Sequence, residues 1–199
     1  MKILVNLFHP QLGTSRVNRR WAEALVGHPE IHVNTLYERY PDWNIDVAHE
    51  QALLAEHDRI VFQHPFWWYS APALMKKWLD DVLTYGWAYG PGGRALHGKE
   101  WVSAISTGGP ADSYQCGGYN SYSMSELLKP FQQTANLTGM KFLPPFLVQG
   151  VVQAGAAEIG ASAEAYVAYI TDPELDPQVR LARLLKGMLE EGVELGAQK

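Results

Sequence analysis

The chain has 199 residues, of which 47% are hydrophobic and 19% are charged, and its 16 basic and 21 acidic side chains give a formal net charge of −5. This length and apolar fraction predict one domain, residues 1–199, with a full core, and they exclude an intrinsically disordered chain. The acidic balance argues against nucleic-acid binding, and the single cysteine, Cys116, excludes an internal disulfide and a cysteine-rich metal site and favours a reducing compartment.

Short apolar runs alternate with amphipathic segments, as strands and helices do in an α/β protein. The strands predicted from this pattern are residues 3–8, 31–36, 59–64, 101–107 and 141–149. The predicted helices lie at about 15–25, from 46 through 54, around the apolar face of Leu74, Met75, Trp78 and Val82, and at about 124–139. Pro130 lies either in the first turn of the last of these helices or at a kink within it.

A helical tail, about residues 155–199, is predicted to hold two further helices. The second has Asp176 as its cap and Pro177 at its first helical position. It carries four apolar side chains at core spacing: Leu181, Leu184, Leu185 and Met188. The sequence leaves open whether this tail serves a partner or covers the sheet.

Five strands separated by helices predict parallel strands with right-handed crossovers and helices on both faces, a doubly wound three-layer α/β sandwich. Ligands bind to such sheets at the carboxyl ends of the strands, near the point where the strand order reverses. The loops after the first, third and fourth strands are therefore the candidate ligand loops.

The first candidate loop, residues 9–18, follows a strand and opens a helix, so its backbone N–H groups and the helix dipole predict an anion site. Thr14 and Ser15 add hydroxyl donors, Arg16 adds a charge and Asn18 adds an amide. The loop is neither the dinucleotide glycine fingerprint nor a P-loop. The alternative is that Thr14 or Ser15 only caps the helix.

The second candidate loop, residues 64–70, holds four consecutive aromatic residues, Phe66, Trp67, Trp68 and Tyr69. Side chains on an extended segment alternate in direction, so some of these rings must line a surface. Flat rings suit a planar heterocycle such as an isoalloxazine, and a dimer interface or a buried corner is the alternative. Trp78, on an apolar helix stripe, is expected in the core.

The third candidate loop contains Ser106, Thr107, Gly108 and Gly109. Adjacent glycines let the backbone approach a ligand and point N–H groups at it, although many glycine pairs are only turns. Residues 114–120 beyond it are polar and aromatic, as in a lid or pocket edge, and Tyr114 is a candidate donor to a reducible carbonyl. The seven histidines show no metal-ligand spacing, so no metal is predicted.

Four segments, residues 36–46, 63–70, 86–90 and 106–109, carry a resemblance that extends from residue 3 to about residue 146. The most specific motif is Trp-Tyr-Ser-x-Pro, followed by a helix with Lys-x-Trp-hydrophobic-Asp. The sequence resembles the flavodoxin-like NAD(P)H:quinone oxidoreductases, and among them the ancillary subunits of glutathione-gated potassium efflux systems. The resemblance implies a five-stranded parallel sheet in the order 2-1-3-4-5.

The resemblance also implies a flavin site. By position, it assigns the flavin's ribityl and phosphate part to His9, Ser15, Arg16, Val17 and Asn18, its ring to Pro65, Phe66, Trp67, Trp68 and Tyr69, and backbone donors at the ring's polar edge to Ser106, Thr107, Gly108 and Gly109. Tyr114 matches a tyrosine that helps with proton transfer in the longer family members. The histidine that accompanies it there is Asn120 here, which is neither an acid nor a base and leaves the proton donor open.

We therefore expect an enzyme in which NAD(P)H reduces the flavin and a quinone or another electrophile then takes two electrons from it. FMN is preferred to FAD because the chain lacks an evident adenosine-binding extension. The family implies a homodimer with residues 85–92 at its interface. The alternatives are a regulatory subunit of a potassium efflux protein, with incidental reductase activity, and a flavodoxin-type electron shuttle.

The expected location is the cytoplasm. The apolar run at the N-terminus, residues 1–8, is too short for a signal peptide, and no run of about 18 apolar residues predicts a membrane-spanning helix. Peripheral attachment at the inner membrane, through a membrane partner, is left open.

Overall fold

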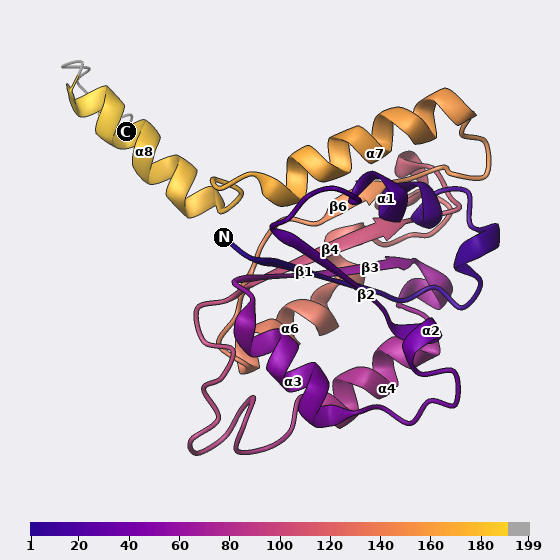
Figure 1. Ribbon diagram of the computed structural model, residues 1–199. Helices are drawn as coiled ribbons and strands as arrows, with labels where there is room; N and C mark the ends of the chain where they lie inside the picture. The colour runs from indigo at the N-terminus through magenta and orange to yellow at the C-terminus, as the bar shows by residue number, and fades with distance from the viewer. Residues whose placement is uncertain (191–199) are drawn as a thin grey trace.

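A six-stranded parallel sheet is the middle layer of the structure, a computed structural model that describes residues 1–190 (Figure 1). Its strands are β1 (Ile3–Leu7), β2 (Ile31–Thr35), β3 (Arg59–Pro65), β4 (Glu100–Ser106), β5 (Lys141–Phe142) and β6 (Phe146–Val148). They lie in the order β2-β1-β3-β4-β5, and β6 also pairs with β4. The predicted parallel order is confirmed.

The predicted fifth strand, residues 141–149, is in fact two short strands, so the expected count of five is wrong. Both pair with β4, β5 beside Glu100 and Trp101 and β6 beside residues 104–106. Pro144 and Pro145 separate them. Because proline has no backbone N–H to give to the ladder, two consecutive prolines interrupt the pairing while the chain keeps its direction along the sheet.

Helices cover both faces of the sheet, as predicted for a doubly wound fold (Figure 1). On one face lie α1 (Asn18–Ala24) and α7 (Ala156–Thr171), and on the other lie α3 (Val47–Glu56), α4 (Ala73–Val82) and α6 (Lys129–Leu137). The short helices are α2 (Leu36–Arg39) and α5 (Met124–Leu127), with 3-10 turns at Leu12–Thr14, Trp67–Tyr69 and Ala111–Ser113. Each face has its own hydrophobic core, and Trp78 is fully buried in one of them, as expected.

Two predicted helices differ from the structure. The first begins at Asn18 rather than Ser15, because residues 12–14 already form a 3-10 turn and Ser15 is extended. The helix predicted over 124–139 is divided at Leu128 into α5 and α6. Pro130 lies in the first turn of α6, which is the first of its two predicted placements, since proline is tolerated only there.

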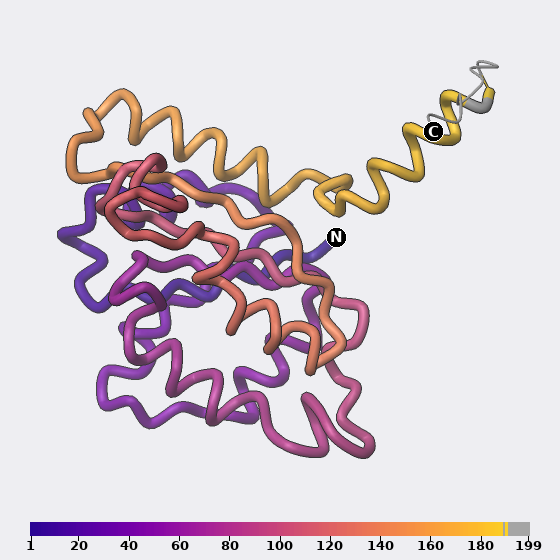
Figure 2. The backbone as a smooth tube through the Cα atoms, turned by 180° about the vertical axis from the view of Figure 1, so that it is seen from behind, coloured from indigo at the N-terminus to yellow at the C-terminus, as the bar shows by residue number. Residues whose placement is uncertain are grey.

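The C-terminal helix α8 (Pro177–Glu190) extends away from the layers (Figures 1 and 2). Asp176 Oδ1 accepts from the Gln178 N–H at 2.9 Å and Pro177 begins the helix, as predicted. The core position expected for its apolar stripe is wrong, because Leu184 is 61% exposed and Leu181 and Leu185 are also exposed. The adjacent sheet face is already covered by α1 and α7, which leaves no surface for α8. Residues 191–199 of the predicted tail lie outside the described residues.

Within residues 1–190, no helix has both the length and the apolar character that crossing a membrane requires.

Candidate functional site

The loops that follow β1, β3 and β4 meet at one edge of the sheet, as predicted. The Asn18 side-chain N–H donates to Ser106 Oγ at 3.0 Å, which joins the first loop to the third. The rings of His9 and Trp67 lie edge to face with centroids 5.9 Å apart, which joins the first loop to the second. Parallel strands end at the same edge of a sheet, so segments far apart in sequence form one surface there.

His9 is held as a neutral hydrogen-bond donor. Its Nδ1 accepts from the Gln11 backbone N–H at 3.1 Å, and burial lowers the pKa of the imidazole. A neutral imidazole whose Nδ1 accepts must carry its proton on Nε2. His9 therefore offers one N–H, without a positive charge, to an acceptor at this edge of the sheet.

The remaining predicted residues of the first loop have unequal access to a ligand. Ser15 Oγ accepts from the N–H of Asn18, the first residue of α1, at 3.1 Å, although the N-cap residue of α1 is Val17, which makes no side-chain cap. Val17 and Asn18 are buried, so they reach a ligand only through backbone groups or the buried Asn18 amide. Arg16 is exposed, and its guanidinium donates to the Ala154 carbonyl at 2.5 Å.

The aromatic loop turns its rings progressively outward after β3. Pro65 ends the strand and is buried, Phe66 is only 9% exposed, and Trp68 is 93% exposed. Trp68 and Tyr69 adopt left-handed backbone conformations with φ of 51° and 57°, which are unfavourable for such residues. The prediction that some of these rings line a surface is confirmed, and the buried-corner alternative is wrong.

The glycine pair of the third loop offers backbone donors. Ser106 and Thr107 are buried, and the Thr107 N–H is already bonded to the Val148 carbonyl at 3.0 Å. Within residues 1–190, the N–H groups of Gly108 and Gly109 have no hydrogen-bond partner. Two adjacent unpaired N–H groups at the end of a strand suit the polar edge of a ligand.

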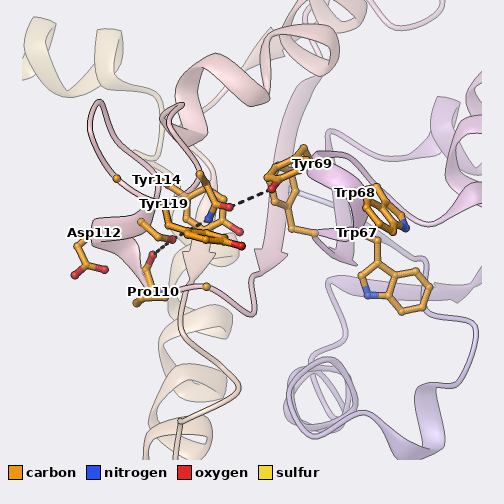
Figure 3. A pocket seen from close by; sticks show the side chains of 12 residues that line it. Trp67, Trp68, Tyr69, Pro110, Asp112, Tyr114 and Tyr119 are labelled. Carbon is orange, nitrogen blue, oxygen red and sulfur yellow. Dashed lines mark hydrogen bonds between the residues drawn. The ribbon is translucent and has the colours of Figure 1, made fainter.

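The aromatic loop and residues 109–120 enclose a cleft of about 930 Å³ (Figure 3). Its lining residues are Phe66, Trp67, Trp68, Tyr69, Gly109, Pro110, Asp112, Ser113, Tyr114, Gly118, Tyr119 and Asn120. Tyr114 and Tyr119 lie on one side, Trp67 and Trp68 lie on the other, and Tyr69 lies between the two groups (Figure 3). The remaining predicted residues lie outside this lining, although His9 reaches it through Trp67.

Of the lid or pocket edge expected over residues 114–120, residues 114 and 118–120 line the cleft, whereas the lining residues 112 and 113 were not predicted. Both belong to the 3-10 turn Ala111–Ser113, whose N-cap is Pro110, the residue after the glycine pair. Proline after two glycines marks a turn, and this is the sequence signal that could have indicated that the following residues bend back along the cleft. Tyr114 packs edge to face on Phe66 with ring centroids 6.1 Å apart, and burial raises the pKa of its phenol.

These features fit a planar, aromatic ligand with a polar edge. The cleft supplies flat rings, the glycine pair supplies two unpaired donors, and its volume lies in the range of small-molecule sites. An isoalloxazine has such a shape and such an edge. Across residues 1–190, no three His, Cys, Asp or Glu side chains are grouped so that they would hold a metal ion.

Comparison with known proteins gives a family match and close relatives. The Flavodoxin_2 family, described as having a flavodoxin-like fold, matches residues 1–170. The chain is 52% identical over 98% of both chains to the uncharacterized NAD(P)H oxidoreductase YdeQ of Bacillus subtilis. It is 44% identical to the glutathione-regulated potassium-efflux system ancillary protein KefG of Salmonella paratyphi B, over 86% of this chain and 94% of that one.

Two solved structures are also similar. General stress protein 14 of Treponema denticola, in complex with FMN, has a TM-score of 0.82 and 41% identity, covering 85% of this chain and 98% of that one. An NADPH-quinone reductase from P. pentosaceus has a TM-score of 0.79 and 33% identity, covering 86% of this chain and 99% of that one.

Proposed function

The chain belongs to the Flavodoxin_2 family of flavodoxin-like proteins, and from that premise we propose that it is an FMN-dependent NAD(P)H oxidoreductase. It reduces quinones or related electrophiles by two-electron hydride transfer. The observation that carries this function is the cleft of about 930 Å³, which has aromatic walls and is lined by Gly109, whose N–H, like that of the adjacent Gly108, is unpaired within residues 1–190. The relatives named as an NAD(P)H oxidoreductase and an NADPH-quinone reductase, and the one solved with FMN, support it.

The proposed FMN site uses all three loops. Phe66, Trp67, Trp68 and Tyr69 take the ring side after Pro65, and the loop of Ser106, Thr107, Gly108 and Gly109 faces the ring's polar edge. The first loop takes the phosphate end through the His9 Nε2–H, the Ser15 hydroxyl and the Arg16 charge, with Val17 and Asn18 forming the buried support. FMN supplies the reversible two-electron chemistry, and the protein supplies orientation, donors and a partly enclosed site.

Tyr114 is the proposed proton donor. Its phenol lines the cleft, and burial raises its pKa above the ordinary phenol value, so at neutral pH it carries its proton as any tyrosine does. A protonated phenol donates a hydrogen bond to a substrate carbonyl and stabilises the charge that develops on the oxygen. The amide of Asn120 is not an acid, so the proton that the reduced substrate takes up comes from the Tyr114 phenol or from solvent.

Two assemblies are proposed. The first is a homodimer with residues 85–92 at the interface, where Tyr85 is exposed and packs edge to face on Tyr89 at 5.7 Å. The second is a complex with a membrane potassium efflux protein, which the 44% identity to KefG supports and which would place the protein at the cytoplasmic face of the inner membrane. Co-purification with such a transporter, or altered efflux on deletion of the gene, would support this regulatory role.

The function is tested on purified protein loaded with flavin. We expect the released cofactor to have the mass of FMN and the flavin absorbance to bleach when NADH or NADPH is added, then to return when a quinone is added. Loaded protein that neither nucleotide bleaches contradicts the proposal. One-electron exchange with a protein partner, without nicotinamide oxidation, would instead support an electron shuttle.

A further inference from the structure

A chain of side-chain hydrogen bonds joins the two walls of the cleft (Figure 3). The Tyr69 hydroxyl donates to Asn120 Oδ1 at 3.2 Å. The Asn120 Nδ2 donates to Ser113 Oγ at 2.9 Å, and the Ser113 hydroxyl donates to the Pro110 carbonyl at 2.7 Å. Tyr69 belongs to the aromatic loop and the other members to the opposite wall.

The direction of every bond in this chain is determined. The Pro110 carbonyl only accepts, so it takes the single hydroxyl proton of Ser113. Ser113 Oγ must then accept, which turns the amide nitrogen of Asn120 toward it and the amide oxygen toward Tyr69. An amide oxygen cannot donate, so the Tyr69 proton is committed to Asn120. The phenol oxygen of Tyr69 therefore offers lone pairs, and no proton, to a molecule in the cleft.

We propose that Asn120 is a positioning residue that makes Tyr69 a hydrogen-bond acceptor for the primary carboxamide of the nicotinamide ring. This inference rests on the proposed function. A carboxamide has N–H donors, whereas a quinone presents only carbonyl acceptors. Tyr69 thus accepts a hydrogen bond from the nucleotide. The protonated phenol of Tyr114, which is not part of this series of hydrogen bonds, donates one to the quinone. These two phenols of the cleft thus recognise two different substrates, the nicotinamide nucleotide and the quinone, which occupy the cleft one after the other.

The backbone around Asn120 holds this arrangement in place. The backbone N–H of Asn120 donates to the Ser113 carbonyl at 2.9 Å. A backbone bond and a side-chain bond therefore both hold Asn120 beside Ser113. The absence of a side chain at Gly109 makes space for these two side chains, because a Cβ there would lie 3.0 Å from Ser113 Oγ and 3.3 Å from Asn120 Nδ2. An amide does not ionise, so the hydrogen-bonding pattern of Asn120 itself does not change with pH.

The test compares two reduced nucleotides, one with the natural carboxamide and one in which an acetyl group replaces it and removes the N–H donors. We expect the ratio of their kcat/KM values to fall about two- to tenfold toward parity in Tyr69→Phe and Asn120→Ala, the loss of one neutral hydrogen bond. The two nucleotides differ in reduction potential by the same amount for every variant, so the change in ratio reports recognition.

Two further variants separate positioning from general disturbance. Asn120→Asp keeps an oxygen that accepts from Tyr69, so it should retain the preference for the carboxamide that Asn120→Ala loses. Tyr122→Phe removes an exposed phenol two residues away, outside the cleft lining, and should behave as the wild type. Quenching of tryptophan fluorescence by the oxidised nucleotides measures the same preference as a ratio of dissociation constants, without turnover.

An unchanged ratio in both Tyr69→Phe and Asn120→Ala, or an equal fall in Tyr122→Phe, overturns the inference. Its failure is distinct from that of the proposed function. Wild-type protein that NAD(P)H does not bleach removes the function itself, whereas bleachable protein with an unchanged ratio removes only the role of Asn120.

Discussion

His64 is a fully buried histidine that the candidate site does not use. It lies on β3 with its ring edge to face on Phe131 at 5.9 Å. Its Nδ1 bonds to the Pro65 carbonyl at 3.0 Å, so Nδ1 carries the proton, and Nε2 has no partner within residues 1–190. Burial lowers the pKa of His64 to about 4, because a charged imidazole there would have lost its water. The residue is thus neutral in the folded protein.

This neutrality makes folding stability depend on pH. The pKa is about 6.5 in the unfolded chain and about 4 in the fold, so between these two pH values the unfolded state binds a proton that the folded state does not. We expect His64 alone to lower the free energy of unfolding by about 2 kcal/mol between pH 7 and pH 5. His64→Leu should remove that part of the slope. Denaturant titrations at both pH values measure it, and equal slopes in wild type and variant contradict the assignment.

Sequence reasoning identified single residues where local chemistry decides their place. Trp78 lies on an apolar helix stripe and is fully buried, and the glycines of the third loop do leave their N–H groups unpaired within residues 1–190. It did not find the bond between Tyr69 and Asn120, which are 51 positions apart. Such a contact depends on how two loops approach across the sheet, and no spacing within either loop encodes that distance.

At the scale of elements, the 3-10 turn Trp67–Tyr69 is strained but exposed. Trp68 is held at φ 51° and ψ 45°, and its ring is 93% exposed, so burial of that ring does not stabilise the conformation. A left-handed conformation costs a non-glycine residue about 1 kcal/mol or more. Strain without compensating burial is found at sites that bind ligands or partners.

Trp68→Gly should therefore separate stability from binding. Glycine adopts this conformation without strain, so we expect the melting temperature of the flavin-free protein to stay unchanged or rise, while the Kd for FMN rises severalfold. Trp43→Gly is the matched control, since Trp43 also has a positive φ of 63° and is partly exposed but lies outside the cleft. Its FMN affinity should equal that of the wild type. A lower melting temperature for Trp68→Gly with unchanged FMN affinity would assign the ring to packing.

The predicted elements were most accurate where a strand or helix is packed in the same way along its whole length. The parallel direction of the strands follows from the alternation of apolar runs and helices, and the strand order follows from the family resemblance; both are confirmed. The predicted strand at 141–149 is interrupted because Pro144 and Pro145 override its apolar composition. Periodicity likewise placed α8 correctly along the chain, yet a periodic stripe indicates only that a face is apolar, not what covers it.

At the scale of the whole molecule, the two C-terminal helices have different relations to the layers. Helix α7 packs on α1 and buries Ile159, Tyr166 and Ile170 in the core of that face. Helix α8 leaves the body after Asp176, and its links back to the body include exposed ion pairs from Arg180 to Asp172 and from Arg183 to Glu174. The family match, which ends at residue 170, includes α7 almost entirely and excludes α8.

Ending the chain after Asp176 should therefore leave the flavin-binding body intact. Exposed ion pairs stabilise a protein by about 0–1 kcal/mol each, which corresponds to a shift of only a few degrees in melting temperature for a chain of this size. We expect the shortened protein to keep its FMN content and NAD(P)H bleaching. Ending it after Ala154 should instead prevent folding, because removing α7 exposes the side of the core that Tyr166 fills. Loss of FMN from the first truncation would show that α8 supports the site despite its exposed stripe.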